Sequence, residues 1–214
     1  MRIKVVLFDL DGTLIDSAED IGLALRKTLE DIGLEELYPE DIRKYVGGGA
    51  RALLEKVLGD KFREEYVEIF REHYLSNPVI YTKPYEGIVE VLKELKERRV
   101  KLAVITNKLE ELSKEILKRL GLLDYFEFIA GGDTFPEKKP SPLPVLKSLE
   151  KLKEEPEKAL VVGDTEADIL AGKAAGTKTA LASWGYVRLN SIKPDHILKS
   201  PKEILEVLDS FRSP

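Results

Sequence analysis

Cysteine is absent from the 214-residue chain, and its absence excludes several kinds of site. The protein has no disulfide bonds, no thiolate nucleophile and no zinc site built on cysteine. A long uninterrupted apolar run is also missing at the start of the chain. The opening sequence MRIKVVLFDLDG contains an apolar stretch, but Asp9 and Asp11 end it. That stretch is too short for a signal-peptide core or a membrane span, so we expect a cytoplasmic protein with no membrane partner.

An excess of positive charge is missing as well. The chain has 34 Lys and Arg residues against 39 Asp and Glu residues, which gives a formal net charge of −5. This balance argues against a general nucleic-acid binder, because such proteins neutralise phosphates with basic patches. A small phosphorylated substrate remains compatible with it, since local charge can oppose the net value. The sequence leaves monomer and homodimer equally open.

Short apolar runs rich in Val, Ile and Leu recur along the chain, with helical stretches between them. The strand candidates are residues 3–9, 101–106, 126–130, 159–163, 177–182 and 195–198. Their apolar character is continuous rather than alternating, which is typical of parallel strands covered on both faces. Alternation with helices predicts right-handed crossovers and a doubly wound parallel α/β sheet. Helix starts are predicted at Ser141-Pro142 and at Ser200-Pro201, the second with a capping-box Glu203.

One segment interrupts the alternation of strands and helices. Residues 10–100 separate the first two strand candidates, although a crossover needs only about a dozen residues. Up to residue 77 the segment is helical in pattern, with helices expected at 18–32, 39–45, 50–58 and 61–76. We interpret residues 17–79 as an inserted α-helical cap subdomain, and residues 1–16 and 80–214 as the core. Hinges are expected at 14–16 and 80–84.

Two acids, Asp9 and Asp11, follow the first apolar run. On an extended chain, side chains two residues apart point the same way, so the two carboxylates are expected to face one site. Gly12 allows a tight turn, and Thr13 offers a hydroxyl and a backbone N–H. Ligands of open α/β sheets bind beyond the carboxyl ends of the strands. Asp-Gly is also a common turn sequence, so the pair indicates a site only if other strand ends carry matching groups.

Matching groups do follow the other strand candidates: Thr106-Asn107, Lys139-Pro140, and Gly163-Asp164 with Asp168 in the next helix. Each has an ordinary explanation, as a helix cap, a solvated turn or an acid favoured by a helix dipole. Four such coincidences at four strand ends are improbable. Clustered carboxylates would need a cation to stay ionised, and hard oxygen ligands suit Mg²⁺. A hydroxyl, an amide and an ammonium suit the oxygens of a phosphoryl group.

This set of motifs resembles that of the haloacid dehalogenase-like superfamily of phosphohydrolases. Asp9-Leu10-Asp11-Gly12-Thr13 is similar to the first motif and Thr106-Asn107 to the second. Lys139-Pro140 is similar to the third motif and Gly163-Asp164-Thr165-Glu166-Ala167-Asp168 to the fourth. The motifs occur in the family's order and cover nearly the whole chain. The resemblance implies a Rossmann-like core with a helical cap of the first type.

The resemblance also implies roles for individual residues. Asp9 would be the nucleophile that forms an aspartyl-phosphate, and Asp11 would act first as general acid and then as general base. Mg²⁺ would bind Asp9, Asp164 and the backbone carbonyl of Asp11, with Asp168 as a nearby partner. Catalysis would also use Thr106 and Lys139. The substrate-binding residues implied are Thr13, Thr106, Asn107, Lys139, Gly48 and Gly49.

Several stretches are similar to phosphoglycolate phosphatases, among them DLDGTLIDSAEDI, PYEGIVEVLKELKE and VVGDTEADILAGKAAGTKTALASWGY. Val46-Gly47-Gly48-Gly49-Ala50 resembles their glycine-containing cap loop. Consecutive glycines permit positive φ and close approach to a ligand, and a helix N-terminus there favours an anionic group. A flexible connector between cap helices is an equal alternative. The resemblance implies hydrolysis of 2-phosphoglycolate to glycolate and phosphate.

Other functions remain open at this stage. A β-phosphoglucomutase-like phosphomutase or a pyrophosphatase would share all four motifs. Mutase caps have an Arg-bearing loop, however, where this chain has glycines. A dehalogenase would need neither Mg²⁺ nor a second carboxylate, so the presence of Asp11 argues against it. A non-catalytic phosphate-binding protein could keep the same fold, but every motif group is present here.

Overall fold

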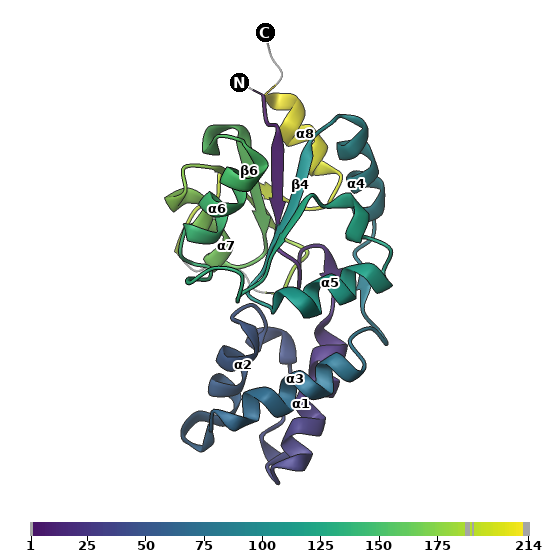
Figure 1. The fold of residues 1–214 in the computed structure, drawn as a ribbon, viewed down its shortest axis with the longest axis vertical. Coiled ribbons are helices and arrows are strands. Elements are labelled where there is room, and N and C mark those ends of the chain that lie inside the picture. Colours follow the sequence, from purple (N-terminus) through teal and green to yellow (C-terminus); the bar gives the residue numbers. More distant parts are fainter. Residues whose placement is uncertain (1, 187–188, 190, 212–214) are drawn as a thin grey trace.

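The computed structural model describes residues 2–186, 189 and 191–211, and its centre is a six-stranded sheet (Figure 1). The strands are β1 (Val5–Phe8), β4 (Lys101–Ile105), β5 (Phe128–Ala130), β6 (Ala159–Gly163), β7 (Lys178–Ala182) and β8 (His196–Leu198). Their order is β5-β4-β1-β6-β7-β8, and every pair is parallel. The chain therefore winds outward from β1 in both directions, which is the doubly wound arrangement. The predicted fold class is confirmed.

Both faces of this sheet are buried. Val6 and Phe8 of β1 pack into one apolar cluster, whereas Val5 and Leu7 pack into a second cluster on the opposite face. Successive side chains of a strand point to opposite faces, so a strand covered on both sides must be apolar throughout. This requirement explains why VVLF, KLAVI and ALVVG read as continuous apolar runs.

Five helices cover the two faces of the sheet. They are α4 (Ile88–Glu97), α5 (Glu110–Arg119), α6 (Leu143–Leu152), α7 (Glu166–Ala174) and α8 (Glu203–Ser210). Buried side chains of α4, α5 and α8 belong to the cluster that holds Phe8, and those of α6 and α7 belong to the other cluster. Figure 1 shows the same division, with α6 and α7 on one side of the strands and α4, α5 and α8 on the other.

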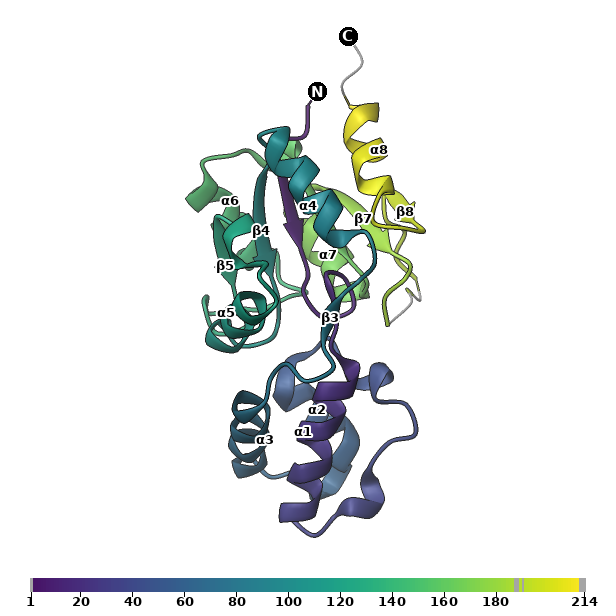
Figure 2. The same cartoon turned by 90° about the vertical axis from the view of Figure 1, so that its right-hand side faces the viewer.

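Three further helices pack together at the end of the molecule opposite the chain termini (Figures 1 and 2). They are α1 (Ala18–Asp31), α2 (Gly49–Leu58) and α3 (Glu65–Ser76). Two short strands, β2 (Ile15–Asp16) and β3 (Lys83–Pro84), join them to the sheet as an antiparallel pair. The predicted cap limits at 17 and 79 lie next to this pair, and the division into two domains stays a prediction.

Some predicted elements differ from the structure. The helix expected at 39–45 is only a 3-10 turn, Ile42–Tyr45, which Asp41 caps by accepting the N–H of Arg43. The helix expected from 61 begins at Glu65, because the turn Gly59–Lys61 is followed by extended backbone at Phe62. Extended backbone cannot continue a helix.

The two proline-marked helix starts are displaced from their predicted positions. Helix α6 begins at Leu143, one residue late, with Pro142 before it, although the Ser141 hydroxyl does accept the N–H of Leu143 at 3.2 Å. Helix α8 begins at Glu203, because the N–H of Glu203 closes a tight turn on the carbonyl of Ser200. The Glu203 carboxylate accepts the N–H of Lys199, so no capping box forms with Ser200. Among the described residues, none of the helices has the length and apolar character needed to cross a membrane.

Candidate active site

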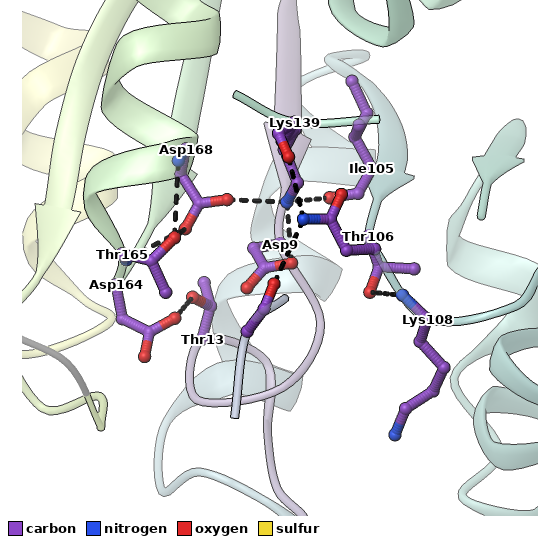
Figure 3. A network of polar contacts seen from close by, with 11 residues as sticks. Asp9, Thr13, Ile105, Thr106, Lys108, Lys139, Asp164, Thr165 and Asp168 are labelled. Carbon is purple, nitrogen blue, oxygen red and sulfur yellow. Dashed lines mark hydrogen bonds and ion pairs between the residues drawn. The ribbon is translucent and has the colours of Figure 1, made fainter. Parts of the chain in front are cut away.

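The chemical groups expected at strand ends meet at one edge of the sheet (Figure 3). Asp9 directly follows β1, Thr106 follows β4 and Asp164 follows β6, and β1 pairs with both other strands. This edge lies at the carboxyl ends of the strands, where the winding direction reverses. β1 ends at Phe8, but Asp9 and Asp11 both line one cavity, as their spacing predicts. The chain turns at Leu10, and the two carboxylates bond to different partners.

Lys139 lies between two of the acids. Its ammonium donates to Asp9 Oδ1 at 2.8 Å, to Asp168 Oδ1 at 2.6 Å and to the carbonyl of Ile105 at 2.5 Å. The side chain is only 4% exposed, and three acceptors use all three N–H donors of the ammonium. Burial alone would lower the pKa of Lys139, but the charges of Asp168 and Asp9 raise it above its ordinary value. The lysine is therefore a fixed cation.

Three carboxylates form a compact cluster. Asp9, Asp164 and Asp168 each offer one oxygen, these oxygens lie within 4.8 Å of one another, and all three residues are buried. Burial, together with the charge of Asp168, raises the pKa of Asp9 to about 7 despite Lys139. Burial and the charges of Asp9 and Asp168 also raise the pKa of Asp164 well above its usual range. One lysine therefore does not balance the cluster, and a hard cation that accepts oxygen ligands fits it.

The protein engages the three carboxylates to different extents. Asp168 accepts Lys139 on Oδ1, and its Oδ2 accepts the N–H and hydroxyl of Thr165 at 2.9 and 2.7 Å in a capping box that begins α7. Asp164 accepts the Thr13 hydroxyl at 3.0 Å and the N–H of Tyr186 at 2.8 Å. Within the described part of the chain, Oδ2 of Asp9 has no hydrogen bond. Asp9 is thus the least committed of the three acids.

Gly12 makes the approach of Asp164 possible. Its φ is +81°, and a Cβ at this position would lie 2.3 Å from Oδ2 of Asp164. Only a residue without a side chain avoids both the left-handed strain and this collision. The Asp-Gly pair, which sequence alone could not separate from an ordinary turn, is therefore required by the site.

Asp11 takes a separate position from the cluster. Its Oδ1 accepts the Ser17 hydroxyl at 2.5 Å and the ammonium of Lys108 at 2.7 Å. Lys108 also donates to the hydroxyl of Tyr74 on α3 at 2.7 Å. Burial would lower the pKa of Lys108, but the charge of Asp11 and the contact with Tyr74 raise it. An ion pair thus joins Asp11 to the helices beyond the sheet.

The second motif is held mainly by backbone contacts. The Asn107 amide donates to the carbonyls of Gly47 at 3.1 Å and Lys139 at 3.0 Å, while its Oδ1 is buried without a partner among the described residues. The Thr106 hydroxyl accepts the N–H of Lys108 at 3.2 Å. With its two amide N–H donors, Asn107 therefore positions both Lys139 and the glycine loop, residues 46–50.

A cavity opens between the sheet edge and the helices. From the sheet side it is lined by Asp9, Asp11, Thr106, Asn107, Lys108, Leu109 and Leu112. From the helical side it is lined by Ile21, Tyr45, Val46, Gly47, Gly49, Ala50, Leu53, Phe70, Arg71 and Tyr74. Of the residues predicted to bind substrate, Gly49 lines the cavity, whereas Gly48 is not in its described lining and accepts Lys138 Nζ on its carbonyl at 2.8 Å.

The glycine loop approaches protein rather than open space. A Cβ at Gly49, where φ is +84°, would lie 2.7 Å from the carbonyl oxygen of Asn107. Helix α2 does begin at Gly49, as the expected loop-to-helix pattern requires. The close backbone approach therefore joins the loop to the second motif.

Sequence reasoning assigned no role to Lys108, Tyr74 or Tyr186. The Tyr186 hydroxyl donates to Asp16 at 2.6 Å and accepts the N–H groups of Ser17 and Ala18 at 2.6 and 3.1 Å. Tyr186 lies four residues after the end of β7, and this position after a strand could have marked it as a candidate site residue. Lys108 directly follows Thr106-Asn107, but nothing in the sequence distinguishes it from a solvated lysine.

Comparisons with known proteins agree with this geometry. A family model described as haloacid dehalogenase-like hydrolase matches residues 6–182. A phosphoglycolate phosphatase of Aquifex aeolicus (strain VF5) is 68% identical over 207 residues, which cover 97% of each chain. A phosphoglycolate phosphatase of Neisseria meningitidis serogroup A is 40% identical over 221 residues, covering 97% of this chain and 94% of the relative.

A solved structure extends the likeness to three dimensions. The crystal structure of a protein described as a predicted phosphoglycolate phosphatase from Haemophilus somnus 129PT superposes with a TM-score of 0.87. The two are 29% identical, and the match covers 97% of this chain and 98% of that one. The residues matched by the family model, 6–182, include Asp9, Thr106, Lys139 and Asp164. The chain belongs to the family of haloacid dehalogenase-like hydrolases.

Proposed function

We propose that this protein is a Mg²⁺-dependent phosphatase that hydrolyses a small phosphomonoester by way of an aspartyl-phosphate on Asp9. The observation that carries the proposal is the placement of Asp9. It is a buried carboxylate with one oxygen bound to Lys139, and it lines a cavity beside Asp11 and Thr106. Nucleophile, acid and counter-charge thus converge at one point, which is the requirement for transfer of a phosphoryl group.

In the first half-reaction, an oxygen of Asp9 attacks phosphorus while the bond to the leaving oxygen breaks. A carboxylate needs no base to become a nucleophile. Asp11 lies two residues away on the same cavity wall and is the group available to give a proton to the leaving oxygen. Thr106 lines the cavity with Asp9 and offers its hydroxyl to the phosphoryl oxygens, while Lys139 stays bound to Asp9 and offsets its charge.

In the second half-reaction, water replaces Asp9 on phosphorus. Asp11, which has lost its proton to the leaving group, takes a proton from that water. The bond between Asp9 and phosphorus then breaks, and Asp9 and free phosphate are regenerated. Ser17 and Lys108 keep the Asp11 carboxylate in place for both proton transfers.

The carboxylate cluster is the proposed metal site. Asp9 and Asp164 would bind Mg²⁺ through their carboxylates, together with the backbone carbonyl of Asp11. Bound Mg²⁺ would supply the positive charge that keeps Asp9 ionised and neutralises phosphoryl oxygens. Asp168 accepts three hydrogen bonds, one of them from the Lys139 ammonium, whereas Asp164 accepts two and has no ion pair among the described residues. We therefore assign Asp168 to orienting Lys139 and the start of α7. Thr13 supports Asp164 in the same way.

We propose 2-phosphoglycolate as the substrate, with glycolate and phosphate as products. The support comes from the relatives named phosphoglycolate phosphatase, one of them 68% identical across nearly the full length of both chains. A small substrate also fits a site enclosed by the sheet edge and α1–α3. The protein is expected to work in the cytoplasm as a monomer or homodimer.

The test is phosphate release from 2-phosphoglycolate with and without Mg²⁺. Replacing Asp9→Asn removes the nucleophile while keeping its size, so kcat should fall by at least about 1,000-fold. The matched control is Asp124→Asn, an exposed acid that is not in the described lining of the cavity, which should keep full activity. Chelation of the metal should abolish turnover reversibly.

Acid quenching during turnover supplies a second readout. The wild-type enzyme should carry phosphate covalently bound to residue 9, and the Asn variant should carry none. Turnover by the Asp9→Asn variant at a rate near that of the wild type would refute the mechanism.

A further inference from the structure

Beyond the groups used for phosphoryl transfer, the described lining of the cavity contains two cations, Lys108 and Arg71. Lys108 comes from the end of β4 and Arg71 from α3, so the two approach from opposite sides of the space. The proposed mechanism leaves Arg71 without a role, and it uses Lys108 only to hold Asp11.

Lys108 has donor capacity in reserve. Its side chain is 8% exposed and bonds to Asp11 Oδ1 and to the Tyr74 hydroxyl, both at 2.7 Å. An ammonium has three N–H donors, so one is left for a further acceptor. No other hydrogen bond of its Nζ is found in the described part of the chain. A buried donor of this kind gains most from a charged acceptor.

Arg71 has an open donor as well. Its Nε is fully buried and has no hydrogen-bond partner among the described residues. Its Nη1 lies 3.5 Å from Glu68 Oε2, at the limit of an exposed and weak contact. Arg71 lies three residues before Tyr74 on α3, and side chains three apart are neighbours on one face of a helix. The Tyr74 hydroxyl in turn accepts a hydrogen bond from Lys108, so Lys108 bonds to the helix that carries Arg71.

The rest of the wall limits what these cations can recognise. Ile21, Leu53, Phe70, Leu109 and Leu112 are apolar and face the same space. Hydroxyl groups of a sugar would meet few polar partners there and would lose their hydration. A compact anion would satisfy both open donors, and a planar carboxylate matches the guanidinium edge.

We propose that Arg71 and Lys108 form a carboxylate subsite that selects phosphomonoesters with a second anionic group close to phosphorus. The inference rests on the proposed phosphatase function and attributes the preference for this class of substrate to two residues. Lys108 then contacts both Asp11 and the substrate carboxylate, while Arg71 binds the carboxylate from the helical side. Phosphomonoesters without a second anionic group leave the buried Nε of Arg71 unpaired and are poorer substrates.

The test compares two substrates of equal carbon number, 2-phosphoglycolate and 2-hydroxyethyl phosphate, which has an alcohol in place of the carboxylate. The variant is Arg71→Met in the full-length enzyme with Mg²⁺. We expect kcat/KM for 2-phosphoglycolate to fall by roughly 30-fold, mainly through KM, since one charged hydrogen bond is lost. The value for 2-hydroxyethyl phosphate should fall far less. Arg71→Lys should recover part of the preference.

Arg51→Met is the matched control. Arg51 lies on α2, is half exposed, pairs with Glu55 and Glu64, and is not in the described lining of the cavity. It changes the charge of the same group of helices, so it should leave the substrate preference as in the wild type. Thermal unfolding of each variant identifies any general loss of structure.

A wild-type enzyme that hydrolyses both substrates equally well would overturn the subsite, and so would equal losses for both substrates in Arg71→Met. Calorimetric titration of the Asp9→Asn variant with 2-phosphoglycolate provides a readout that needs no turnover. Weaker binding after adding Arg71→Met, but not Arg51→Met, supports the subsite even if no phosphomonoester is hydrolysed. Such weaker binding without any hydrolysis would refute the phosphatase proposal alone. Hydrolysis together with equal binding by the variants with and without Arg71→Met would refute the subsite alone.

Discussion

At the scale of single residues, Lys139 decides how much negative charge the site can hold. Its ammonium donates to Asp9, Asp168 and the Ile105 carbonyl. Because the side chain is only 4% exposed, solvent cations cannot easily take its place. Two buried carboxylates thus depend on one cation. Loss of that cation leaves uncompensated charge in the interior, which is far more costly than losing a surface ion pair.

Replacing Lys139→Met should therefore destabilise the metal-free protein by about 3 kcal/mol at pH 7. The loss should shrink at pH 5, since Asp9, whose pKa burial raises to about 7, then takes up a proton and no longer needs the ammonium. Urea unfolding in the presence of a chelator at the two pH values measures both effects. Lys147→Met on α6 is the control, because its pair with Glu150 is exposed. A loss of the same size at both pH values would contradict the argument.

The raised pKa of Asp9 predicts a second pH effect. Burial raises this pKa from 3.8 to about 7, so between these values the folded protein binds more protons than the unfolded chain. The free energy of unfolding of the metal-free protein should then decrease as pH rises from 4 to 7, by on the order of 2 kcal/mol. Asp9→Asn should flatten this dependence, as measured by urea unfolding with chelator.

Mg²⁺ should reverse the pH trend. Metal binding needs ionised carboxylates and releases protons, so Mg²⁺ affinity should rise with pH up to about 7. Calorimetric titration in buffers of different ionisation heat would detect the released protons. An affinity independent of pH between 5 and 8 would show that Asp9 is already ionised before the metal binds.

Sequence alone could identify the acids and Lys139, because each follows a strand and each belongs to a motif with recognisable neighbours. It could not identify Arg71 or Lys108. An arginine on a helix and a lysine after a strand are usually solvated, and only tertiary packing places both in the lining of one cavity. The sequence likewise could not show that both N–H donors of the Asn107 amide bond to backbone carbonyls.

At the scale of elements, Asp20 fixes the return of the chain from α3 to the sheet. It lies in the first turn of α1 and is 2% exposed. Its carboxylate accepts the N–H groups of Ile80, Tyr81 and Thr82 and the Thr82 hydroxyl, the last at 2.6 Å. A charge near a helix N-terminus is favoured by the helix dipole, and here it also orders an irregular segment.

Asp20→Ala should lower the free energy of unfolding by about 3 kcal/mol, because it leaves several backbone N–H groups without an acceptor. Thr82→Val removes a single bond of the same network and should cost about 1 kcal/mol. Urea denaturation of both variants gives the comparison. Equal costs would mean that the backbone bonds to Asp20 contribute nothing.

The elements that sequence predicted well are those decided by their own apolar pattern. All six strands of the central sheet lie within two residues of their predicted ranges, since continuous apolar runs are required by a sheet buried on both faces. The two-residue strands β2 and β3 have no such run and are not predicted. The starts of α3 and α8 were misplaced because tight turns at Gly59 and Ser200 delay the helix, and such turns follow from local backbone geometry. The prediction of a helix at 39–45 is wrong because only four of these residues form a 3-10 turn.

At the scale of the whole molecule, the helices and the sheet edge meet through a few side-chain contacts around the cavity. Asn107 binds the Gly47 carbonyl, Lys138 binds the Gly48 carbonyl and Lys108 binds Tyr74. These contacts are polar and lie beside the cavity, so they can break when substrate enters or product leaves. One apolar cluster also includes residues of both parts, so we expect relative motion where these polar contacts, rather than apolar packing, join them.

The double variant Tyr74→Phe with Lys138→Met removes two of these contacts and should shift the helices away from the sheet. Small-angle X-ray scattering without substrate should give a larger radius of gyration than for the wild type. The control is Lys147→Met together with Tyr81→Phe, since neither residue lines the cavity in its described part. Identical scattering curves for the double variant and the wild type would show that apolar packing alone holds the closed arrangement.

The antiparallel pair β2–β3 has a consequence for engineering. It places Asp16 opposite Lys83, so the chain leaves the sheet and returns to it at adjacent points. Paired strands can be joined by a turn of two residues, such as Asn-Gly. Everything from Ser17 to Thr82 could thus be exchanged for a short turn or for a foreign set of helices without rerouting a single strand of the sheet. The substrate preference of the proposed phosphatase could then be exchanged together with this segment, between chains that share the same two crossing points.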